Sequence, residues 1–237
     1  MKVKIYPGFA QGQVKIPPSK SLLHRAIICA SLAKGTSNIK NVIYSDDVKA
    51  TIEAFRFLGV KIEKQENSLK VVGFGNLFFS GDELIDCNES GTTLRFLTPL
   101  LANDKGICLT GKSTLLSRPM TIYESIFREK NLIFEKNEEG YYLKGNLPSG
   151  IYEIEGNVSS QFISGLLLTL PLRENDSEVI IKGDFESAKY VDLTIDVMQS
   201  FGVYIDKTES GYHIRGNQVY QSNNYRVEAD CSQLAFF

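Results

Sequence analysis

The hydrophobic and polar positions of this chain follow one pattern three times. In each copy a helical segment ends at a residue that tolerates left-handed backbone, and two short segments of alternating apolar and polar residues follow. Gly59, Asn131 and Gly202 hold that position, where most other side chains would be strained. A repeat at a spacing of about seventy residues predicts one supersecondary unit used three times. The copies are residues 58–73, 130–145 and 201–216.

Two kinds of helix precede each hairpin. The first is apolar nearly all round, as in residues 22–32 and 162–168, which predicts full burial. The second has one apolar stripe, formed in the first copy by Val48, Ile52 and Phe55, and therefore packs on one side only. We predict one globular domain of the α/β (α+β) class, built from three βαβαββ repeats with buried parallel helices inside and sheets outside. The expected hairpin turns are residues 65–68, 137–140 and 208–211.

A fourth copy begins near the end of the sequence. Residues 228–233 align with residues 155–160, which open the third buried helix, and the final residues 234–237 are apolar. Chain ends are usually polar and loosely held. We therefore interpret the sequence as the front part of a longer protein.

Composition narrows the classes of function. The 237 residues include 26 basic and 28 acidic side chains, with a formal net charge of −2, which argues against broad binding to nucleic acid or anionic membranes. Cys29, Cys87, Cys108 and Cys231 lack the spacing of a zinc site or a disulfide framework. No apolar run is long enough for a signal peptide or a membrane span. We expect no metal site and a cytoplasmic location.

The starts of the three buried helices carry the candidate chemistry. Helices of like orientation bring their positive N-terminal ends together, so a common mouth attracts anions. Arg25 and Arg95 each lie one turn into an otherwise apolar helix, where an unpaired charge is costly. The Ser and Thr residues could be simple N-caps, but three matching sites favour an anion pocket. The residues are Ser19, Lys20, Ser21 and Arg25; Ser90, Gly91, Thr92 and Arg95; and Ser159, Ser160 and Gln161.

Five stretches form an ordered set along the chain: residues 18–26 (PSKSLLHRA), 89–95 (ESGTTLR), 116–120 (LSRPM), 158–162 (VSSQF) and 187–192 (SAKYVD). This set resembles the signatures of the 3-phosphoshikimate 1-carboxyvinyltransferase family, also called enolpyruvylshikimate phosphate (EPSP) synthase. The first stretch is highly specific, and the other four gain their weight from their order.

The resemblance implies a two-domain enzyme, with three βαβαββ units in each domain and the substrates in the cleft between them. It implies transfer of the enolpyruvyl group from phosphoenolpyruvate to the 5-hydroxyl of shikimate 3-phosphate, on the route to chorismate and the aromatic amino acids, without metal or organic cofactor. Residues 1–15 would then form a strand of the missing partner domain, residues 16–226 the substrate-binding domain of three repeats, and residues 227–237 the truncated start of the second domain. Because the family's acid–base carboxylates lie in the second half, the chain alone would bind shikimate 3-phosphate weakly and turn nothing over.

Carried over position by position, the resemblance assigns the site residues. Lys20 is the expected catalytic residue, because its ammonium would lie between the substrates and neutralise charge as the tetrahedral intermediate forms. Ser21 and Arg25 would bind the carboxylate of shikimate 3-phosphate. The other expected substrate-binding residues are Ser159, Ser160 and Ser187 at its phosphate, Gln161 and Tyr190 along its ring, and Gly91, Thr92, Arg95 and Arg118 around phosphoenolpyruvate.

Two positions depart from the family pattern. Thr114 stands where the family commonly carries an Arg that binds phosphoenolpyruvate, which leaves Lys112 and Arg118 as alternative cations and bears on glyphosate binding. Glu89 stands where Asn is common.

Other hypotheses stay open from the sequence. The chain could be a stand-alone module that binds a phosphorylated metabolite, or a structural repeat protein. Two enzymes share the expected fold. UDP-N-acetylglucosamine enolpyruvyl transferase should show Lys-Asn where this chain has Lys20-Ser21, and RNA 3′-phosphate cyclase should be more basic.

Overall fold

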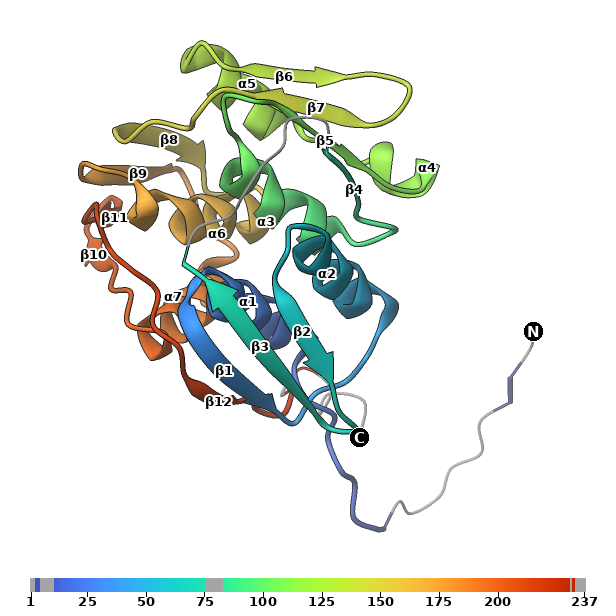
Figure 1. The fold of residues 1–237 in the computed structure, drawn as a ribbon. Helices are drawn as coiled ribbons and strands as arrows, with labels where there is room; N and C mark the ends of the chain where they lie inside the picture. Colours follow the sequence, from blue (N-terminus) through green and yellow to red (C-terminus); the bar gives the residue numbers. More distant parts are fainter. Residues whose placement is uncertain (1–2, 5–10, 76–82, 231, 233–237) are drawn as a thin grey trace.

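The computed structural model describes residues 3–4, 11–75, 83–230 and 232 of the 237 residues. Three four-stranded sheets lie around a central group of helices (Figure 1). The strand orders are β12-β1-β3-β2, β4-β5-β7-β6 and β10-β11-β9-β8. The prediction of buried helices inside and sheets outside is therefore confirmed.

The three sheets are built alike from three consecutive units. In each sheet one parallel pair of strands flanks a buried helix, and an antiparallel hairpin completes the other edge. The first unit contains α1 (Lys20–Leu32), β1 (Lys34–Lys40), α2 (Asp46–Phe57), β2 (Lys61–Lys64) and β3 (Ser68–Phe74). The second contains β4 (Glu83–Asp86), α3 (Gly91–Leu101), β5 (Ile107–Thr110), α4 (Ser113–Leu116), α5 (Thr121–Glu129), β6 (Ile133–Lys136) and β7 (Tyr141–Lys144). The third contains β8 (Ile151–Glu155), α6 (Ser160–Thr169), the 3₁₀ helix η1 (Leu170–Leu172), β9 (Ser177–Lys182), α7 (Ala188–Ser200), β10 (Asp206–Thr208) and β11 (Gly211–Ile214).

The first sheet takes its outer parallel strand from the far end of the chain. Strand β12 (Asn224–Arg226) pairs in parallel with β1, with Asn38 opposite Asn224 and Lys40 opposite Arg226. In the other two units this position is held by the strand that directly precedes the buried helix, β4 or β8. The fourth copy that begins in the sequence thus supplies the strand that the first unit lacks.

The expected domain boundaries stay predictions. Most of the expected strand over residues 1–15, and most of the expected second-domain start over residues 227–237, lie outside the described residues. Within the described part, residues 17–19 pair with the segment that follows β12. Ser19 N–H donates to the Glu228 carbonyl at 2.8 Å, and Asp230 N–H donates to the Pro17 carbonyl at 2.8 Å.

The residues after the second helix of each unit adopt the expected left-handed backbone. Gly59 has a φ of 90°, Asn131 of 56° and Gly202 of 80°. Each ends its helix and turns the chain into the hairpin. The repeat recognised in the sequence is therefore also a repeat of backbone conformation.

Helices α1, α3 and α6 form the core, and α3 and α6 pack closely. From Leu22 to Leu32 every residue of α1 is buried. At the α3–α6 contact Gly165 leaves no room for a side chain, because a Cβ there would lie 2.2 Å from the Tyr123 hydroxyl oxygen and 2.8 Å from the Arg95 carbonyl oxygen. The buried Tyr123 hydroxyl lies 2.9 Å from the Arg95 carbonyl and 3.0 Å from that of Phe162, so it ties the two helices together.

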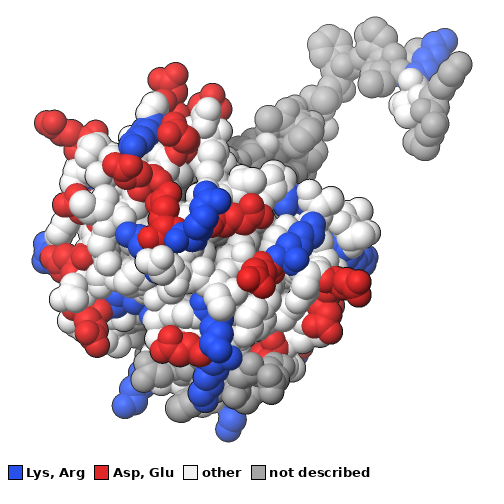
Figure 2. Space-filling model, turned by 90° about the horizontal axis from the view of Figure 1, so that it is seen from above, with Lys and Arg blue, Asp and Glu red and all other residues white. Residues whose placement is uncertain are grey.

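The surface charges are mixed in sign, and the described cysteines are free and buried. Basic and acidic side chains are interspersed over the face shown in Figure 2, without a broad patch of one sign. Cys29, Cys87 and Cys108 are free and buried, whereas Cys231 lies outside the described residues. Over the described ranges, no helix is long and apolar enough to cross a membrane, and no group of three or more His, Cys, Asp or Glu could hold a metal ion.

Replacement of Gly165 by Ala tests the α3–α6 contact. Helix propensity alone would make this change stabilising by about 1 kcal/mol, whereas the close approach predicts a loss of about 1–3 kcal/mol in the free energy of unfolding. Urea unfolding followed by circular dichroism measures the sign. Ser200→Ala, on the exposed face of α7, is the control and should change stability little. A stabilised Gly165→Ala protein would contradict the packing described here.

Candidate functional site

The buried helices begin with matching N-caps. The Ser19 Oγ accepts from the Leu22 N–H at 3.4 Å, and the Ser90 Oγ accepts from the Thr93 N–H at 3.1 Å. The Ser159 Oγ accepts from the Gln161 N–H at 3.4 Å. The interpretation of these serines as N-caps is thus correct. Contacts between the helices are made by other side chains, those of Arg25, Gln161 and His24.

Arg25 joins the start of α1 to α6 and α7. Its Nε donates to the Thr194 Oγ1 at 2.6 Å, and Thr194 in turn lies 2.7 Å from the Ser164 Oγ of α6. Its Nη atoms donate to the carbonyls of Ser21, at 2.7 Å, and Tyr190, at 3.1 Å. The side chain is buried, with 3% of its residue surface exposed.

Every hydrogen-bond acceptor of Arg25 in the described structure is neutral. Burial lowers the pKa of Arg25 to about 10, and no described carboxylate forms a salt bridge with it. The guanidinium also lies 5.0 Å from the centre of the Phe96 ring. A buried cation held only by dipoles and a ring face is electrostatically incomplete, because burial of an unpaired charge is costly. An anion nearby would compensate for this cost.

Gln161 joins the start of α6 to α3. Its amide nitrogen donates to the Thr92 Oγ1 at 2.8 Å, and its amide oxygen accepts from an Arg95 Nη at 2.9 Å. The Arg95 guanidinium also stacks on Phe162, 4.7 Å from the ring centre. Partial burial lowers the pKa of Arg95. Three predicted site residues from two helices therefore form one contact group.

A chain of buried side chains joins α1 to α3 through α2. The His24 Nδ1 lies 2.7 Å from the Thr51 Oγ1, which lies 2.7 Å from the Thr93 Oγ1. The Thr93 hydroxyl donates to the Ser90 Oγ at 2.7 Å, so Thr51 must donate to Thr93. This order of donors assigns the proton of His24 to Nδ1. The buried Nε2 of His24 has no hydrogen-bond partner.

Together these three links connect the amino-terminal halves of α1, α3 and α6, with side chains of α2 and α7 between α1 and the other two helices. That the three helix starts form one anion-binding mouth stays a prediction. Arg25 and Arg95 place two positive charges in this region of a chain whose net charge is −2.

Lys20, the expected catalytic residue, is the first residue of α1. Its Nζ forms a salt bridge with the Asp47 Oδ2 at 2.6 Å, and its side chain is 48% exposed. Asp47 lies in the first turn of α2. The carboxylate holds the ammonium in place without removing it from solvent. Sequence reasoning did not identify Asp47.

Arg118 and Gly91 lie in contact beside α3. A Cβ on Gly91 would lie 2.7 Å from an Nη atom of Arg118, so the absence of a side chain there lets the guanidinium lie against the helix start. Arg95 also reaches this segment, since an Nη donates to the Pro119 carbonyl at 3.4 Å. The structure thus brings together the four residues predicted around phosphoenolpyruvate, which are Gly91, Thr92, Arg95 and Arg118.

The two positions that depart from the family pattern contact each other. The Thr114 hydroxyl, on α4, donates to the Glu89 Oε1 at 3.3 Å. The Glu89 Oε2 also lies 3.5 Å from the Lys112 Nζ. Lys112 is therefore already paired with a carboxylate. Arg118, the other alternative cation, forms no salt bridge in the described structure.

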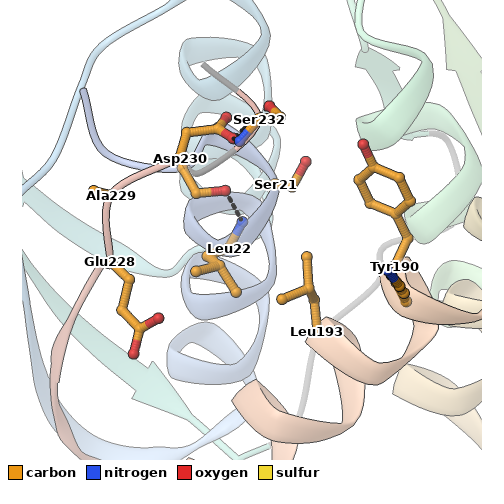
Figure 3. Close-up of a pocket in the computed structure, with 10 residues that line it drawn as sticks. Ser21, Leu22, Tyr190, Leu193, Glu228, Ala229, Asp230 and Ser232 are labelled. Atoms are coloured by element: carbon orange, nitrogen blue, oxygen red, sulfur yellow. Dashed lines mark hydrogen bonds between the residues drawn. The ribbon is translucent and has the colours of Figure 1, made fainter. Parts of the chain in front are cut away.

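A cavity of about 310 Å³ opens beside the start of α1 (Figure 3). Tyr190 and Leu193 of α7 form one wall, the segment from Glu228 to Asp230 forms the other, and Ser21 lies between them. Tyr190 is 49% exposed. Because Arg25 donates to the carbonyls of Ser21 and Tyr190, it supports two residues that line this cavity.

The three serines predicted at a phosphate lie at the starts of α6 and α7. Ser159 is exposed, whereas Ser160 is buried with 8% of its surface accessible. The Ser187 hydroxyl, at the N-cap of α7, donates to the Val158 carbonyl at 3.3 Å. The carbonyl of Val158 thus places Ser187 beside the turn that leads into α6. The roles of these serines stay predictions.

Several site residues were missed by sequence reasoning. Lys189, Leu193 and Glu228 line the cavity, and Thr194 and Ser164 hold Arg25. Lys189 lies inside one of the quoted stretches and could have been found there. The other four come from helix interiors or from a distant segment, where no local pattern marks them.

The fold is a domain of three βαβαββ units around buried helices, and capping serines and the cations Arg25 and Arg95 lie near the starts of those helices. The family model for EPSP synthase (3-phosphoshikimate 1-carboxyvinyltransferase) matches residues 7–237. The chain belongs to this family.

Individual relatives agree with this assignment. The 3-phosphoshikimate 1-carboxyvinyltransferase of Clostridium beijerinckii is 47% identical over 99% of this chain and 56% of its own length. The enzyme of that name from Clostridium perfringens strain SM101 is 47% identical over 100% of this chain and 57% of its own. A solved EPSP synthase from Acinetobacter baumannii superposes with a TM-score of 0.82 and 26% identity, over 95% of this chain and 51% of that one. The chain thus spans little more than half the length of these relatives.

The buried His24 predicts a pH dependence of stability. Burial lowers its pKa from 6.5 to about 3, so between these values the unfolded chain binds a proton that the folded chain does not. The neutral imidazole therefore contributes stability that is complete above pH 6.5 and is lost as the pH falls towards 3. From pH 7 to pH 4 the loss should be about 3 kcal/mol.

Urea unfolding at several pH values checks this prediction. A His24→Gln variant should lose this part of the pH dependence. His213→Gln, at the partly exposed second histidine of the chain, should keep it. Equal pH profiles for the His24→Gln and wild-type proteins would show that His24 does not titrate as its burial requires.

Proposed function

We propose that this chain provides the shikimate 3-phosphate half of the active site of a 3-phosphoshikimate 1-carboxyvinyltransferase. The whole enzyme would transfer the enolpyruvyl group of phosphoenolpyruvate to the 5-hydroxyl of shikimate 3-phosphate and release phosphate. The observation that carries the proposal is Arg25, a buried cation without a carboxylate partner in the described structure, which holds two residues of an open cavity at the start of α1.

The cavity offers complementary groups for a hydroxylated, doubly anionic ring. Ser19 and Ser21 provide hydroxyls, and Lys189 provides a cation. Tyr190 provides a ring face and a phenol, and Asp230 can accept from a substrate hydroxyl. The carboxylate of the ligand would lie towards Ser21 and Arg25, and its phosphate towards Ser159, Ser160 and Ser187. Because Arg25 is covered by Ser21 and Tyr190, direct contact with a ligand requires these two residues to move apart.

Phosphoenolpyruvate would bind beside the start of α3. Arg118 lies against Gly91 there, and Arg95 holds the same segment through the Pro119 carbonyl. Guanidinium groups suit this ligand because they can hold a carboxylate or a phosphate through two N–H groups. Gln161 contacts Thr92 and Arg95 and thus lies at the border between the two substrate positions.

Lys20 would act between the two substrates. As the 5-hydroxyl adds to the enolpyruvyl group, negative charge on the phosphate and carboxylate oxygens must be balanced, and a fixed ammonium lowers the energy of that state. Asp47 would act as a positioning residue, since its carboxylate lies 2.6 Å from the Lys20 Nζ and restrains the side chain before the substrates arrive.

The remaining groups would come from a second domain. The relatives are nearly twice as long as this chain, which covers 56% or 57% of them. We assign to that domain the acid–base carboxylates, further cations for phosphoenolpyruvate and the second wall of the cleft. The proposal requires no metal or organic cofactor, and it places the reaction in the cytoplasm.

Calorimetry with shikimate 3-phosphate tests the proposed half-site. Arg25→Ala should weaken binding at least tenfold, the loss expected for a charge-assisted hydrogen bond of about 1.5–3 kcal/mol. Arg128→Ala, on an exposed helical site, is the matched control and should bind as the wild type does. Circular dichroism must show that both variants are folded. Unchanged affinity in a folded Arg25→Ala protein would reject the assignment of Arg25.

A phosphate-release assay with both substrates tests the division between the domains. The chain alone should release no phosphate from phosphoenolpyruvate above the rate without protein. Turnover by this chain alone would contradict the proposal that a second domain supplies the acid–base groups.

A further inference from the structure

A second cavity, of about 520 Å³, lies at the opposite end of α6 from Ser159 and Gln161. It is formed by the loop between β7 and β8 and by the loop that follows η1. The cavity is lined by Leu147, Pro148, Ser149, Leu172, Arg173 and Asn175, together with Asn146 and the exposed carboxylate side chain of Glu174. None of them belongs to the site described above.

Arg173 is the unusual member of this lining. Its Nε is buried and has no hydrogen-bond partner. In the described part of the chain no carboxylate forms a salt bridge with it, and the neighbouring Glu174 is exposed. Burial lowers the pKa of Arg173, and the phenol of Tyr152, rather than a carboxylate, offsets this. The Nε–H of this guanidinium thus lacks the acceptor that a buried N–H group ordinarily has.

Ser149 adds a donor to the cavity, and two backbone carbonyls beside it already accept hydrogen bonds. The Ser149 Oγ accepts from the Asn175 N–H at 3.1 Å, which leaves its hydroxyl hydrogen free to donate into the cavity. The Pro148 carbonyl accepts from the Tyr152 hydroxyl, and the Glu174 carbonyl accepts from the Asn217 amide. A cation and a hydroxyl donor in one cavity are complementary to an oxyanion.

The remaining lining is apolar. Leu147, Pro148 and Leu172 line the same cavity as the guanidinium. A bare inorganic anion would leave this surface and most of the volume unused. A ligand with a carboxylate at one end and an apolar body at the other would use both parts of the site.

We propose that this cavity is a second ligand site, which binds a small organic carboxylate. The carboxylate accepts from Arg173 and Ser149, and the apolar body packs against Leu147, Pro148 and Leu172. This site is independent of the proposed transferase function. The site lies at the carboxyl end of α6, away from the helix starts.

Benzoate is a suitable probe, and inorganic phosphate is the comparison. Isothermal titration at constant ionic strength should give a dissociation constant on the order of 1 mM for benzoate. Phosphate should bind at least about tenfold more weakly, because it has no apolar body. In two-dimensional NMR spectra the Nε–H signal of Arg173 should shift on titration with benzoate.

Two variants complete the test. Arg173→Gln should weaken benzoate binding at least about tenfold, whereas Arg128→Gln, at an exposed arginine, should leave it unchanged. If Arg173→Gln does not fold, Arg173→Lys, which keeps the charge but loses the planar fork, should weaken binding instead. Equal binding by the folded Arg173 variant and the wild type, or an Arg173 signal that does not respond to benzoate, would overturn the proposal. Phosphate binding as tight as that of benzoate would also overturn it.

Discussion

The site depends on one buried interaction, the contact of the Arg25 guanidinium with Thr194, Ser21 and Tyr190. The charged side chain of Arg25 lies inside a core of otherwise apolar helices, and only neutral oxygen atoms accept its hydrogen bonds. Such an arrangement is stable only if every donor is satisfied and the helices keep their positions. The same contacts therefore specify how α1, α6 and α7 lie together and hold positive charge next to the cavity.

The sheets contribute to this arrangement from outside. The sheet of each unit covers only one side of its apolar helix. The other side must be covered by the helices of the neighbouring units, which is the general reason for repetition in such folds. The hairpins and amphipathic helices differ in sequence from copy to copy, but the left-handed residues Gly59, Asn131 and Gly202 repeat the same turn. The repeated backbone does not determine which side chains stand at the helix starts. These side chains therefore differ between the copies, with Lys20 in the first, Gly91 in the second and Gln161 in the third.

Much of this could be predicted from the sequence, because the decisive signals are local. Periodicity identified the buried and amphipathic helices, and small residues before apolar runs identified the helix starts. Ordered motifs identified the family. The partners of those residues could not be predicted in the same way. Asp47 and Thr194 lie on helices whose pattern indicates only an apolar stripe, and Ser164 lies on one that is apolar nearly all round. Their contacts join residues 27 to 169 positions apart.

The buried histidine and the second cavity show the same limit. Nothing local to His24 indicates that Thr51 and Thr93 will order its proton, because each comes from a different helix. Nothing local to Arg173 indicates that its Nε will lack an acceptor. Short α4, which carries Thr114, was also not expected, since four residues are too few for a helical period to be visible.

The position of β12 has a consequence for biosynthesis. The backbone and amide contacts between Asn38 and Asn224 join residues separated by 186 positions, so the first sheet stays one strand short until the third unit has been synthesised. Loop closure over such a distance is slow compared with hairpin formation. The β1 edge of the nascent chain therefore stays unpaired until residues 224–226 have left the ribosome. That interval is when the amino-terminal unit is most exposed to association with other chains and to capture by chaperones.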